Sequence, residues 1–250
     1  MKPAPFKDHF SAVAQDYAQS RPGYPDALFD WIAARAPATD LAWEPGCGSG
    51  QATRGLARRF AAVHASDPSA EQVAQALAPT NVRFVVEPGE RCSLASASAD
   101  AVCVAQALHW FDRPAFFAEC ARVLRPRGLL VAWSYGDLCV PTSLAAAMGA
   151  FSREILPWWP AERRLVCAGY ADFEWPFEAV EAPAFPLEAQ WPLARLLGYL
   201  SSYSATRRMR EATGIDPVAV HASAIARAWG DPGAIQRLHW PLSVHARRKP

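Results

Sequence analysis

Short apolar runs alternate with segments of helical periodicity over residues 40–135. The apolar runs lie at 40–44, 61–67, 82–86, 101–105 and 129–134. Runs of this length, bounded by glycine, proline or acidic residues, are typical of buried strands. Segments 50–60 and 114–124 carry apolar residues three or four apart, which predicts helices between the strands. The alternation predicts a doubly wound α/β fold with a mostly parallel sheet.

The segment before these runs reads as helical. Phe6, Phe10, Val13 and Tyr17 share one helix face, and a second helix starts at Pro25 after a break rich in proline. We therefore predict an N-terminal helical cap over residues 1–36 and a core domain over 37–135.

The last part of the chain is less regular. Segments 142–156, 192–203 and 216–229 predict helices. Segment 174–181, bordered by prolines, predicts an edge or irregular strand. A final strand is expected at 238–246. We divide this part into a helical lid insert that includes the sixth strand (136–234) and a closing strand of the core sheet (235–250).

A glycine loop follows the first apolar run. The run ends at Glu44, and Gly46, Gly48 and Gly50 follow at alternate positions. Glycine lets the backbone turn sharply and approach a ligand without Cβ interference. Such a loop between a strand and a helix commonly holds a nucleotide-like cofactor, although the spacing differs from the G-x-G-x-x-G of dinucleotide sites. A glycine-rich turn without a ligand is the alternative interpretation.

Asp67 ends the second apolar run, seventeen residues after Gly50. At the carboxyl end of a second strand its oxygens could accept both ribose hydroxyls of a nucleoside. It could instead cap a helix that starts at Ser69.

The segment E-P-G-x-G-x-G resembles the first motif of the class I S-adenosylmethionine-dependent methyltransferases. Residues 122–130 resemble the helix, turn and strand that follow the active site in that family. The pattern Phe10-x6-Tyr17-x3-Arg21-Pro22-x-Tyr24-Pro25, and segment 198–204, resemble the methyltransferase type 11, trans-aconitate-methyltransferase-like subgroup. The resemblance implies a Rossmann-like, seven-stranded, mostly parallel sheet with a reversed final strand and helical lid insertions, and S-adenosylmethionine as cofactor, with S-adenosylhomocysteine as product.

Residues 37–135 would then be the cofactor-binding core. The cofactor contacts that the resemblance and the loop imply are Tyr17, Arg21, Glu44, Gly46, Cys47, Gly48, Gln51, Asp67, Pro68, Glu90, Gln106 and Ala107. Arg21 is a candidate partner for a carboxylate of either cofactor or substrate, or else a solvated cation. Glu90 could equally belong to a plain surface turn.

His109 and Trp110 follow the fourth apolar run, at the edge where sheets of this kind bind ligands. His109 could act as a general base, or it could be a packed ring bonded to backbone. The candidate substrate contacts are Tyr24, His109, Trp110, Trp158 and Tyr203. Aromatic residues are more often core than pocket, and the sequence does not separate the two.

Composition excludes several classes of function. The net charge is +1, from 25 basic and 24 acidic residues, so no nucleic-acid partner is implied. The start lacks the apolar core of a signal peptide and no run approaches a membrane span, so we expect a cytoplasmic protein without a membrane partner. Six cysteines without a C-x-x-C pair, and histidines without zinc-ligand spacing, predict a reduced protein without a bound metal.

These observations predict a methyltransferase that acts on a small molecule as monomer or homodimer. O-methylation of a small carboxylic acid is the first hypothesis, and an oxygen or nitrogen atom of another small metabolite is the second. An NAD-dependent oxidoreductase on a similar sheet remains an alternative, against which the glycine spacing argues. A cofactor-binding protein without turnover is another.

Overall fold

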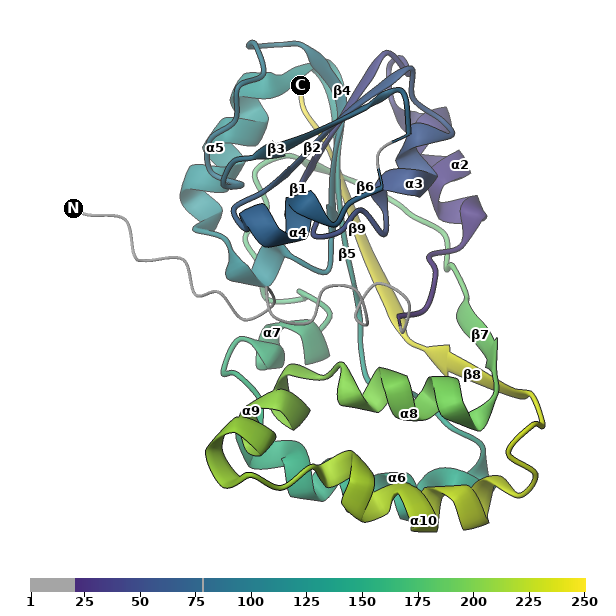
Figure 1. The fold of residues 1–250 in the computed structure, drawn as a ribbon. Helices are drawn as coiled ribbons and strands as arrows, with labels where there is room; N and C mark the ends of the chain where they lie inside the picture. The colour runs from purple at the N-terminus through teal and green to yellow at the C-terminus, as the bar shows by residue number, and fades with distance from the viewer. Residues whose placement is uncertain (1–20, 78) are drawn as a thin grey trace.

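A twisted seven-stranded sheet forms the centre of the computed structural model, which describes residues 21–77 and 79–250 (Figure 1). The strands are β1 (Leu41–Pro45), β2 (Ala62–Asp67), β3 (Val82–Val86), β4 (Ala99–Ala105), β5 (Leu124–Tyr135), β6 (Glu178–Val180) and β9 (Leu242–Arg248). Their order across the sheet is β3-β2-β1-β4-β5-β9-β6. The first five strands pair in parallel, and β9 runs antiparallel to both β5 and β6. The Rossmann-like fold class with its reversed final strand is thereby confirmed.

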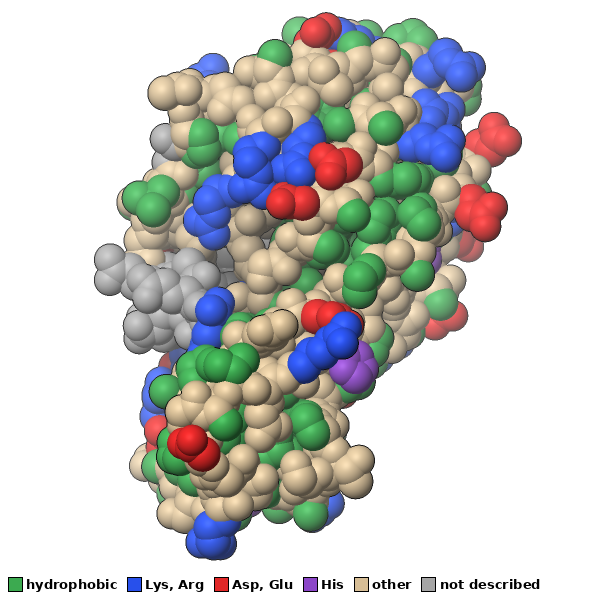
Figure 2. Space-filling model, turned by 90° about the vertical axis from the view of Figure 1, so that its right-hand side faces the viewer, with side chains coloured by type: hydrophobic (Ala, Val, Ile, Leu, Met, Phe, Trp, Pro, Cys, Tyr) green, Lys and Arg blue, Asp and Glu red, His purple; other side chains and the backbone are tan. Residues whose placement is uncertain are grey.

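Helices cover both faces of the sheet, because successive strand residues alternate between the two sides. Ala42 packs with α2 (Asp26–Arg35) and α3 (Thr53–Ala57) on one face. Trp43 packs with α5 (Arg113–Val123) on the other face, where residues of α7 (Arg163–Cys167) join the same cluster. The α2 and α3 flank lies on the right of Figure 1 and faces the viewer in Figure 2.

A second layer of helices lies below the carboxyl ends of the parallel strands (Figure 1). We call this layer the lid. It comprises α6 (Thr142–Ile155), η3 (Leu156–Trp158), β7 (Leu187–Trp191), α8 (Leu193–Ser201), α9 (Ser204–Thr213), α10 (Pro217–Trp229) and β8 (Gln236–Trp240). Strand β6 separates its two contributions, so the lid is assembled from an insertion before β6 and another between β6 and β9.

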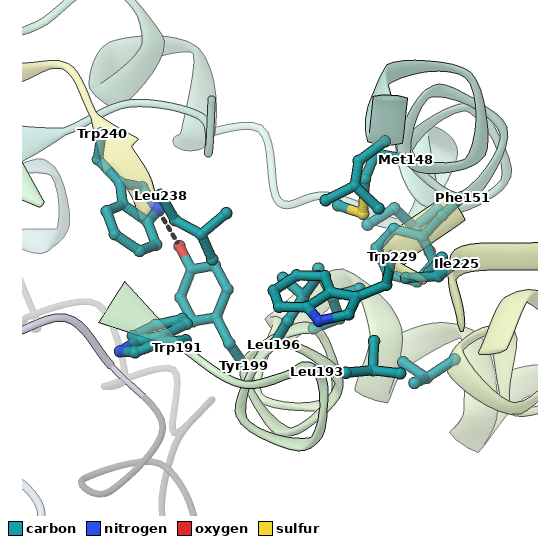
Figure 3. Close-up of a cluster of buried hydrophobic side chains, with 14 of the residues drawn as sticks. Met148, Phe151, Trp191, Leu193, Leu196, Tyr199, Ile225, Trp229, Leu238 and Trp240 are labelled. Atoms are coloured by element: carbon teal, nitrogen blue, oxygen red, sulfur yellow. Dashed lines mark hydrogen bonds between the residues drawn. The ribbon is translucent and has the colours of Figure 1, made fainter. Parts of the chain in front are cut away.

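The lid has its own hydrophobic core (Figure 3). Leu196 and Tyr199 from α8 pack there with Phe151 of α6 and Trp229 of α10, and all four are buried. Trp240 Nε1 donates a hydrogen bond of 2.8 Å to Tyr199 Oη, which gives the one polar atom of each buried ring a partner. A separate core of this kind lets the lid hold a fixed shape beside the sheet.

Two expected elements differ from the structure. The strand expected at 238–246 is two strands, β8 and β9, divided at Pro241, which has no backbone N–H for a ladder. Only β9 joins the core sheet, because β8 pairs with β7 in the lid. The helix expected at 50–60 is reduced to α3, since the glycine loop extends through a turn as far as Ala52.

Other expected elements are confirmed in whole or in part, and one falls outside the described residues. Segment 174–181 contains an edge strand, as predicted, but only its last part, β6, is paired. The helix expected at 192–203 is α8, and α9 directly after it was not predicted. The helix carrying Phe6 to Tyr17 lies outside the described residues. No helix in the described ranges combines the length and the apolar character that crossing a bilayer requires.

Candidate active site

The strand order reverses at β1, because β2 lies on one side of it and β4 on the other. In open α/β sheets, ligands bind beyond the carboxyl ends of the strands at such a point. The glycine loop follows β1 and residues 106–111 follow β4. The fold therefore brings together two segments for which the sequence predicted cofactor contacts.

The three glycines of the loop all have positive φ, at 70°, 54° and 85° for Gly46, Gly48 and Gly50, which L-residues rarely adopt. Their surroundings differ. A Cβ on Gly46 would lie 2.6 Å from the Ala107 Cβ, and one on Gly50 would lie 2.9 Å from the Phe84 ring. Among the described residues, a Cβ on Gly48 would have only one atom within 4 Å, the Gln72 Oε1 at 3.7 Å. Gly46 and Gly50 therefore permit close packing, and Gly48 presents the open face of the loop.

Glu44, at the end of β1, is a buried carboxyl group. Its Oε2 accepts a hydrogen bond of 2.5 Å from Thr53 Oγ1. Burial raises the pKa of Glu44 to about 8, and the nearby charge of Asp67 acts in the same direction. The group is therefore mostly protonated at neutral pH and would ionise if a cation came beside it. A ligand with a cationic group suits this end of the sheet.

Asp67 ties the second strand to the glycine loop. Its Oδ2 accepts from the Gly48 N–H and its Oδ1 from the Ser69 N–H, both at 2.9 Å. The N-cap of α4 (Ala70–Ala74) is Ser69, whose Oγ accepts from the Gln72 N–H. The helix-cap alternative for Asp67 is thus wrong, because the Ser69 side chain caps the helix. The ribose-binding role stays a prediction, with the carboxylate held beside Gly48.

Gln106 and Ala107 line the turn after β4. Gln106 has a φ of +54°, and its side-chain amide donates to the Tyr135 carbonyl and accepts from the Tyr135 N–H. The amide therefore extends the β4–β5 ladder by one residue. Ala107, buried against Gly46, fixes the distance between the two loops.

The other predicted cofactor contacts lie around this edge. Glu90 Oε1 accepts from the Asp112 N–H at 2.8 Å and so holds the residue that caps α5. Gln51 Nε2 donates to the Pro22 carbonyl, which anchors the N-terminal segment to the loop. Cys47 is buried, and its burial raises the pKa of the thiol well above its ordinary value. Pro68 is half-buried after Asp67, and Tyr17 lies outside the described residues.

A cavity of about 90 Å³ lies between the turn after β4, the end of β5 and the lid. Five predicted site residues line it together: Arg21, Gln106, His109, Trp110 and Tyr203. Its charged groups also include Arg163 and Asp137, which form an ion pair. Tyr135, Trp159 and Tyr199 complete the aromatic wall. Of these, Tyr135 was not predicted.

Arg21 connects the core to the lid. Its Nη1 donates to Tyr135 Oη at 2.9 Å and its Nη2 to the Ser202 carbonyl at 3.3 Å. The guanidinium carbon lies 5.4 Å from the ring centre of Tyr199 and 6.0 Å from that of Tyr203, within cation–π range. The guanidinium thus sits in an aromatic environment on the wall of the cavity.

His109 lies in η2 (Leu108–Trp110), and its Nδ1 is hydrogen-bonded to Tyr170 Oη at 2.8 Å. Burial lowers the pKa of His109 to about 3, so the ring is neutral at physiological pH. Tyr170 is fully buried and has a φ of +60°, an unusual conformation for an aromatic residue. A base with so low a pKa is weak, which favours a positioning role over general base catalysis.

Two predicted substrate contacts lie elsewhere. Trp158 packs against the lid core and does not line this cavity, where its neighbour Trp159 does. Tyr24 packs edge-on against Trp133 and lines a separate groove. The sequence offered no signal to choose between adjacent tryptophans. Tyr170 follows a glycine with positive φ, and only the fold shows which side chain it contacts.

The sheet order, the reversed β9 and the glycine loop at the point of reversal define a Rossmann-like domain of the kind that binds nucleotide-like cofactors. The family model described as Methyltransferase domain matches residues 43–132. A candidate methyltransferase of Dictyostelium discoideum is 34% identical over 208 residues, which cover 81% of this chain and 79% of the relative. An uncharacterized methyltransferase of Mycobacterium tuberculosis is 38% identical over 133 residues, which cover 51% of this chain and 53% of that protein.

A solved structure agrees with these relatives. A candidate type II methyltransferase from Anaeromyxobacter dehalogenans is 42% identical, with a TM-score of 0.85 over 91% of this chain and 97% of that one. The chain therefore belongs to the class I S-adenosylmethionine-dependent methyltransferases, in the family of the Methyltransferase domain. The resemblance to the trans-aconitate-type subgroup stays a prediction.

Proposed function

We propose that this protein transfers a methyl group from S-adenosylmethionine to a carboxylate oxygen of a small acid. The observation that carries the proposal is the guanidinium of Arg21 on the wall of a small aromatic cavity, beside the turn after β4. An arginine in such a setting binds a carboxylate strongly, because its fork of N–H donors matches two carboxylate oxygens.

The residues of the glycine loop fit the cofactor. The open face at Gly48 leaves room for a ligand against the backbone, and Asp67 is held beside it with both oxygens in polar contacts. Glu44 supplies a buried carboxyl group that ionises next to a cation. Bound S-adenosylmethionine would supply an electrophilic methyl group on a sulfonium. The protein then has to hold the acceptor oxygen in line with that methyl group and exclude water.

The charge of the cavity favours an anion. Among the described residues, Arg21 and Arg163 line it against one carboxylate, Asp137, which gives a net charge of +1. The walls are otherwise largely aromatic, which suits the apolar part of a small organic acid. The proposed acceptor is therefore a small, partly apolar carboxylate.

A carboxylate acceptor also agrees with the weak base in the site. A carboxylate is ionised at neutral pH and needs no proton removed before it attacks. The neutral ring of His109, fixed by Tyr170, can hydrogen-bond an acceptor oxygen without changing its protonation state. His109 is thus proposed as a positioning group on the acceptor side.

The test is methyl transfer from tritiated S-adenosylmethionine into a set of small acids. A methyl ester product releases volatile methanol in mild base, which separates O-methylation of a carboxylate from methylation at nitrogen or at an alcohol oxygen. If label enters only other metabolites, the acid hypothesis is wrong and the second hypothesis takes its place. If no acceptor is labelled although S-adenosylhomocysteine binds, the protein is a cofactor binder without turnover. Preference for NADH in calorimetry would contradict the methyltransferase proposal itself.

Arg21→Met decides whether the arginine serves the acceptor. We expect the KM for the acceptor to rise by about tenfold or more with little change in affinity for S-adenosylhomocysteine, as for loss of one charge-assisted hydrogen-bonded pair. Arg208→Met, an exposed position on α9, is the matched control. Lost cofactor affinity with an unchanged acceptor KM would assign Arg21 to the cofactor. We further propose that the enzyme works in the cytoplasm as a monomer or homodimer, which light scattering would resolve.

A further inference from the structure

A second, larger hollow lies on the α2 and α3 flank of the molecule. This groove has a volume of about 690 Å³ and runs between α3 of the core and α8 of the lid. Four guanidinium groups line it: Arg21, Arg54, Arg58 and Arg195. Among residues 21–77 and 79–250, no acidic side chain lines it. Figure 2 shows basic side chains on the upper, core half of this face and further ones below, over the helical half.

The charge of the groove is only weakly neutralised by its surroundings. Arg58 pairs with Asp26 at 2.6 Å, but both side chains are more than half exposed, and exposed pairs of this kind contribute little. Arg195 stacks on the Trp191 ring, at 4.9 Å from its centre, which leaves its N–H groups available. Arg54 makes no hydrogen bond or ion pair with the described part of the chain. The groove therefore presents several guanidinium donors to solvent.

The groove and the aromatic cavity of the candidate active site share one lining residue. Arg21 lines both the groove and the aromatic cavity. Near Arg21, the groove is lined by Gly23 and Gly198, which have no side chain to fill it. Arg21 therefore forms the wall that the two hollows share, and a molecule whose reacting end occupies the cavity would reach the groove by moving this side chain aside.

We propose that the groove binds a phosphorylated tail of the methyl acceptor, a diphosphate in preference to a single phosphate. This proposal rests on the proposed function only in that the reacting end of the acceptor is taken to be a carboxylate. One carboxylate needs one arginine, here Arg21. The three further arginines of the groove, with no acid among the described residues that line it, match a group with several negative charges. Guanidinium groups bind phosphate oxygens in pairs, so arginines from two sides of a groove hold a diphosphate at both ends.

The binding test uses inorganic pyrophosphate and does not depend on turnover. Calorimetry at physiological ionic strength, with the protein saturated in S-adenosylhomocysteine, should show one saturable site. Arg54→Gln combined with Arg195→Gln should weaken binding by about thirtyfold or more, since each arginine contributes about five- to tenfold. Arg208→Gln combined with Arg210→Gln removes the same charge from the exposed face of α9 and should change affinity less than twofold.

Three results would overturn the site. They are absence of saturable binding, an equal loss in the control pair, and citrate binding as tightly as pyrophosphate, which would indicate a general attraction for anions. Competition between pyrophosphate and S-adenosylhomocysteine would place the anion in the cofactor site and would also contradict the proposal.

A second arm distinguishes a tail of the acceptor from a separate phosphate ligand. Pairs of acids that differ only in a phosphorylated tail are compared as acceptors, and the phosphorylated member should have a KM at least about tenfold lower. The Arg54 and Arg195 double variant should abolish this difference while leaving kcat/KM for the plain acid unchanged. Pyrophosphate binding without such a preference would make the groove a site for a separate ligand and overturn its assignment to the acceptor. Intact pyrophosphate binding without any methyl transfer would contradict the proposed function, and with it the assignment of the groove to an acceptor, but not the anion site itself.

Discussion

The core and the lid place their functional groups by different means. In the core, backbone geometry positions most of them, as the positive φ of Gly48 and its N–H bound to Asp67 illustrate. In the lid, tertiary packing of side chains decides, as where Tyr199 and Tyr203 surround Arg21 from another part of the chain. Backbone geometry depends on the type and spacing of neighbouring residues, but side-chain packing depends on which helices meet. The candidate cofactor side of the site can therefore be predicted from the sequence, whereas the candidate acceptor side can be recognised only from the fold.

Substitution at Gly48 should have the largest effect. It tests whether backbone geometry positions the functional groups of the core. Gly48→Val should lower affinity for S-adenosylhomocysteine by about a hundredfold or more, because a branched side chain fills the open face of the loop at a φ that L-residues avoid. Isothermal calorimetry measures the loss.

Gly214→Val provides a matched control for backbone strain. Gly214 ends α9 with a φ of +72°, and a Cβ at this position would have no atom of the described residues within 4 Å. The backbone strain is therefore similar, at a position outside the glycine loop. Both variants should lose about 1–2 kcal/mol of unfolding free energy, and only the first should lose cofactor affinity. Unchanged affinity in Gly48→Val would show that another surface holds the cofactor.

Asp67→Ala should weaken cofactor binding by about 1.5–3 kcal/mol, the range for hydrogen bonds to a charged acceptor. Ser69→Ala removes the neighbouring cap of α4 and should reduce stability by about 1 kcal/mol with cofactor affinity retained. Thermal unfolding and calorimetry on both variants separate the roles. Equal affinities in the two variants would contradict a ribose contact at Asp67.

Glu44 predicts a pH dependence. With a pKa of about 8 the carboxyl is protonated in the free protein at pH 7, and a cationic ligand group favours the carboxylate. Affinity for S-adenosylmethionine should therefore rise by up to about tenfold per pH unit from about pH 6 and level off above the pKa, with proton release on binding. Glu44→Gln should remove the glutamate's share of this slope.

The same group affects stability. The folded protein keeps a proton on Glu44 that the unfolded chain, with a pKa near 4.5, releases. Its contribution to stability is therefore present below pH 4.5 and is lost as pH rises towards 8. Chemical unfolding of Glu44→Gln should show a smaller decline over this range than the wild type. Identical pH profiles would mean that Glu44 is ionised in the free protein.

The smallest effect belongs to the lid. Tyr199→Phe should reduce the unfolding free energy by about 1–2 kcal/mol, because the Trp240 Nε1–H loses its acceptor inside the lid core. A double-mutant cycle with Trp240→Phe isolates the pair and should show a coupling of about 1 kcal/mol. Cofactor affinity should stay unchanged, which would confirm that the lid core and the glycine loop are energetically separate.

The three glycines show what sequence could and could not predict in the core. Their spacing predicted the loop, its place after a strand and its sharp turn. The different surroundings of the three glycines were not predictable, because Gly46 packs against Ala107 and Gly50 against Phe84, and both partners come from distant segments of the chain. In the same way, Asp67 was correctly placed at a strand end, but the competing cap at Ser69 became visible only from hydrogen bonds.

In the lid, α6, α8 and α10 were predictable from periodicity, and their assembly was not. Helix α9 was not predictable in this way because most of its side chains are polar, and its buried face consists of Ala205, Thr206 and Met209. Strand β8 was merged with β9 because the apolar pattern continues through Pro241. Trp159 and Tyr170 reach the site from turns whose directions depend on the finished fold.

The chain leaves the core sheet and finally re-enters it at two neighbouring residues. Strand β5 leaves the sheet at Tyr135 and β9 enters it at the paired residue Leu242, with the Gly136 N–H bonded to the Pro241 carbonyl. The first departure and the last return are therefore neighbours in one antiparallel pair. A lineage could exchange the lid, together with α7 and β6, at this pair, and with it the proposed acceptor wall, while the glycine loop is passed on unaltered.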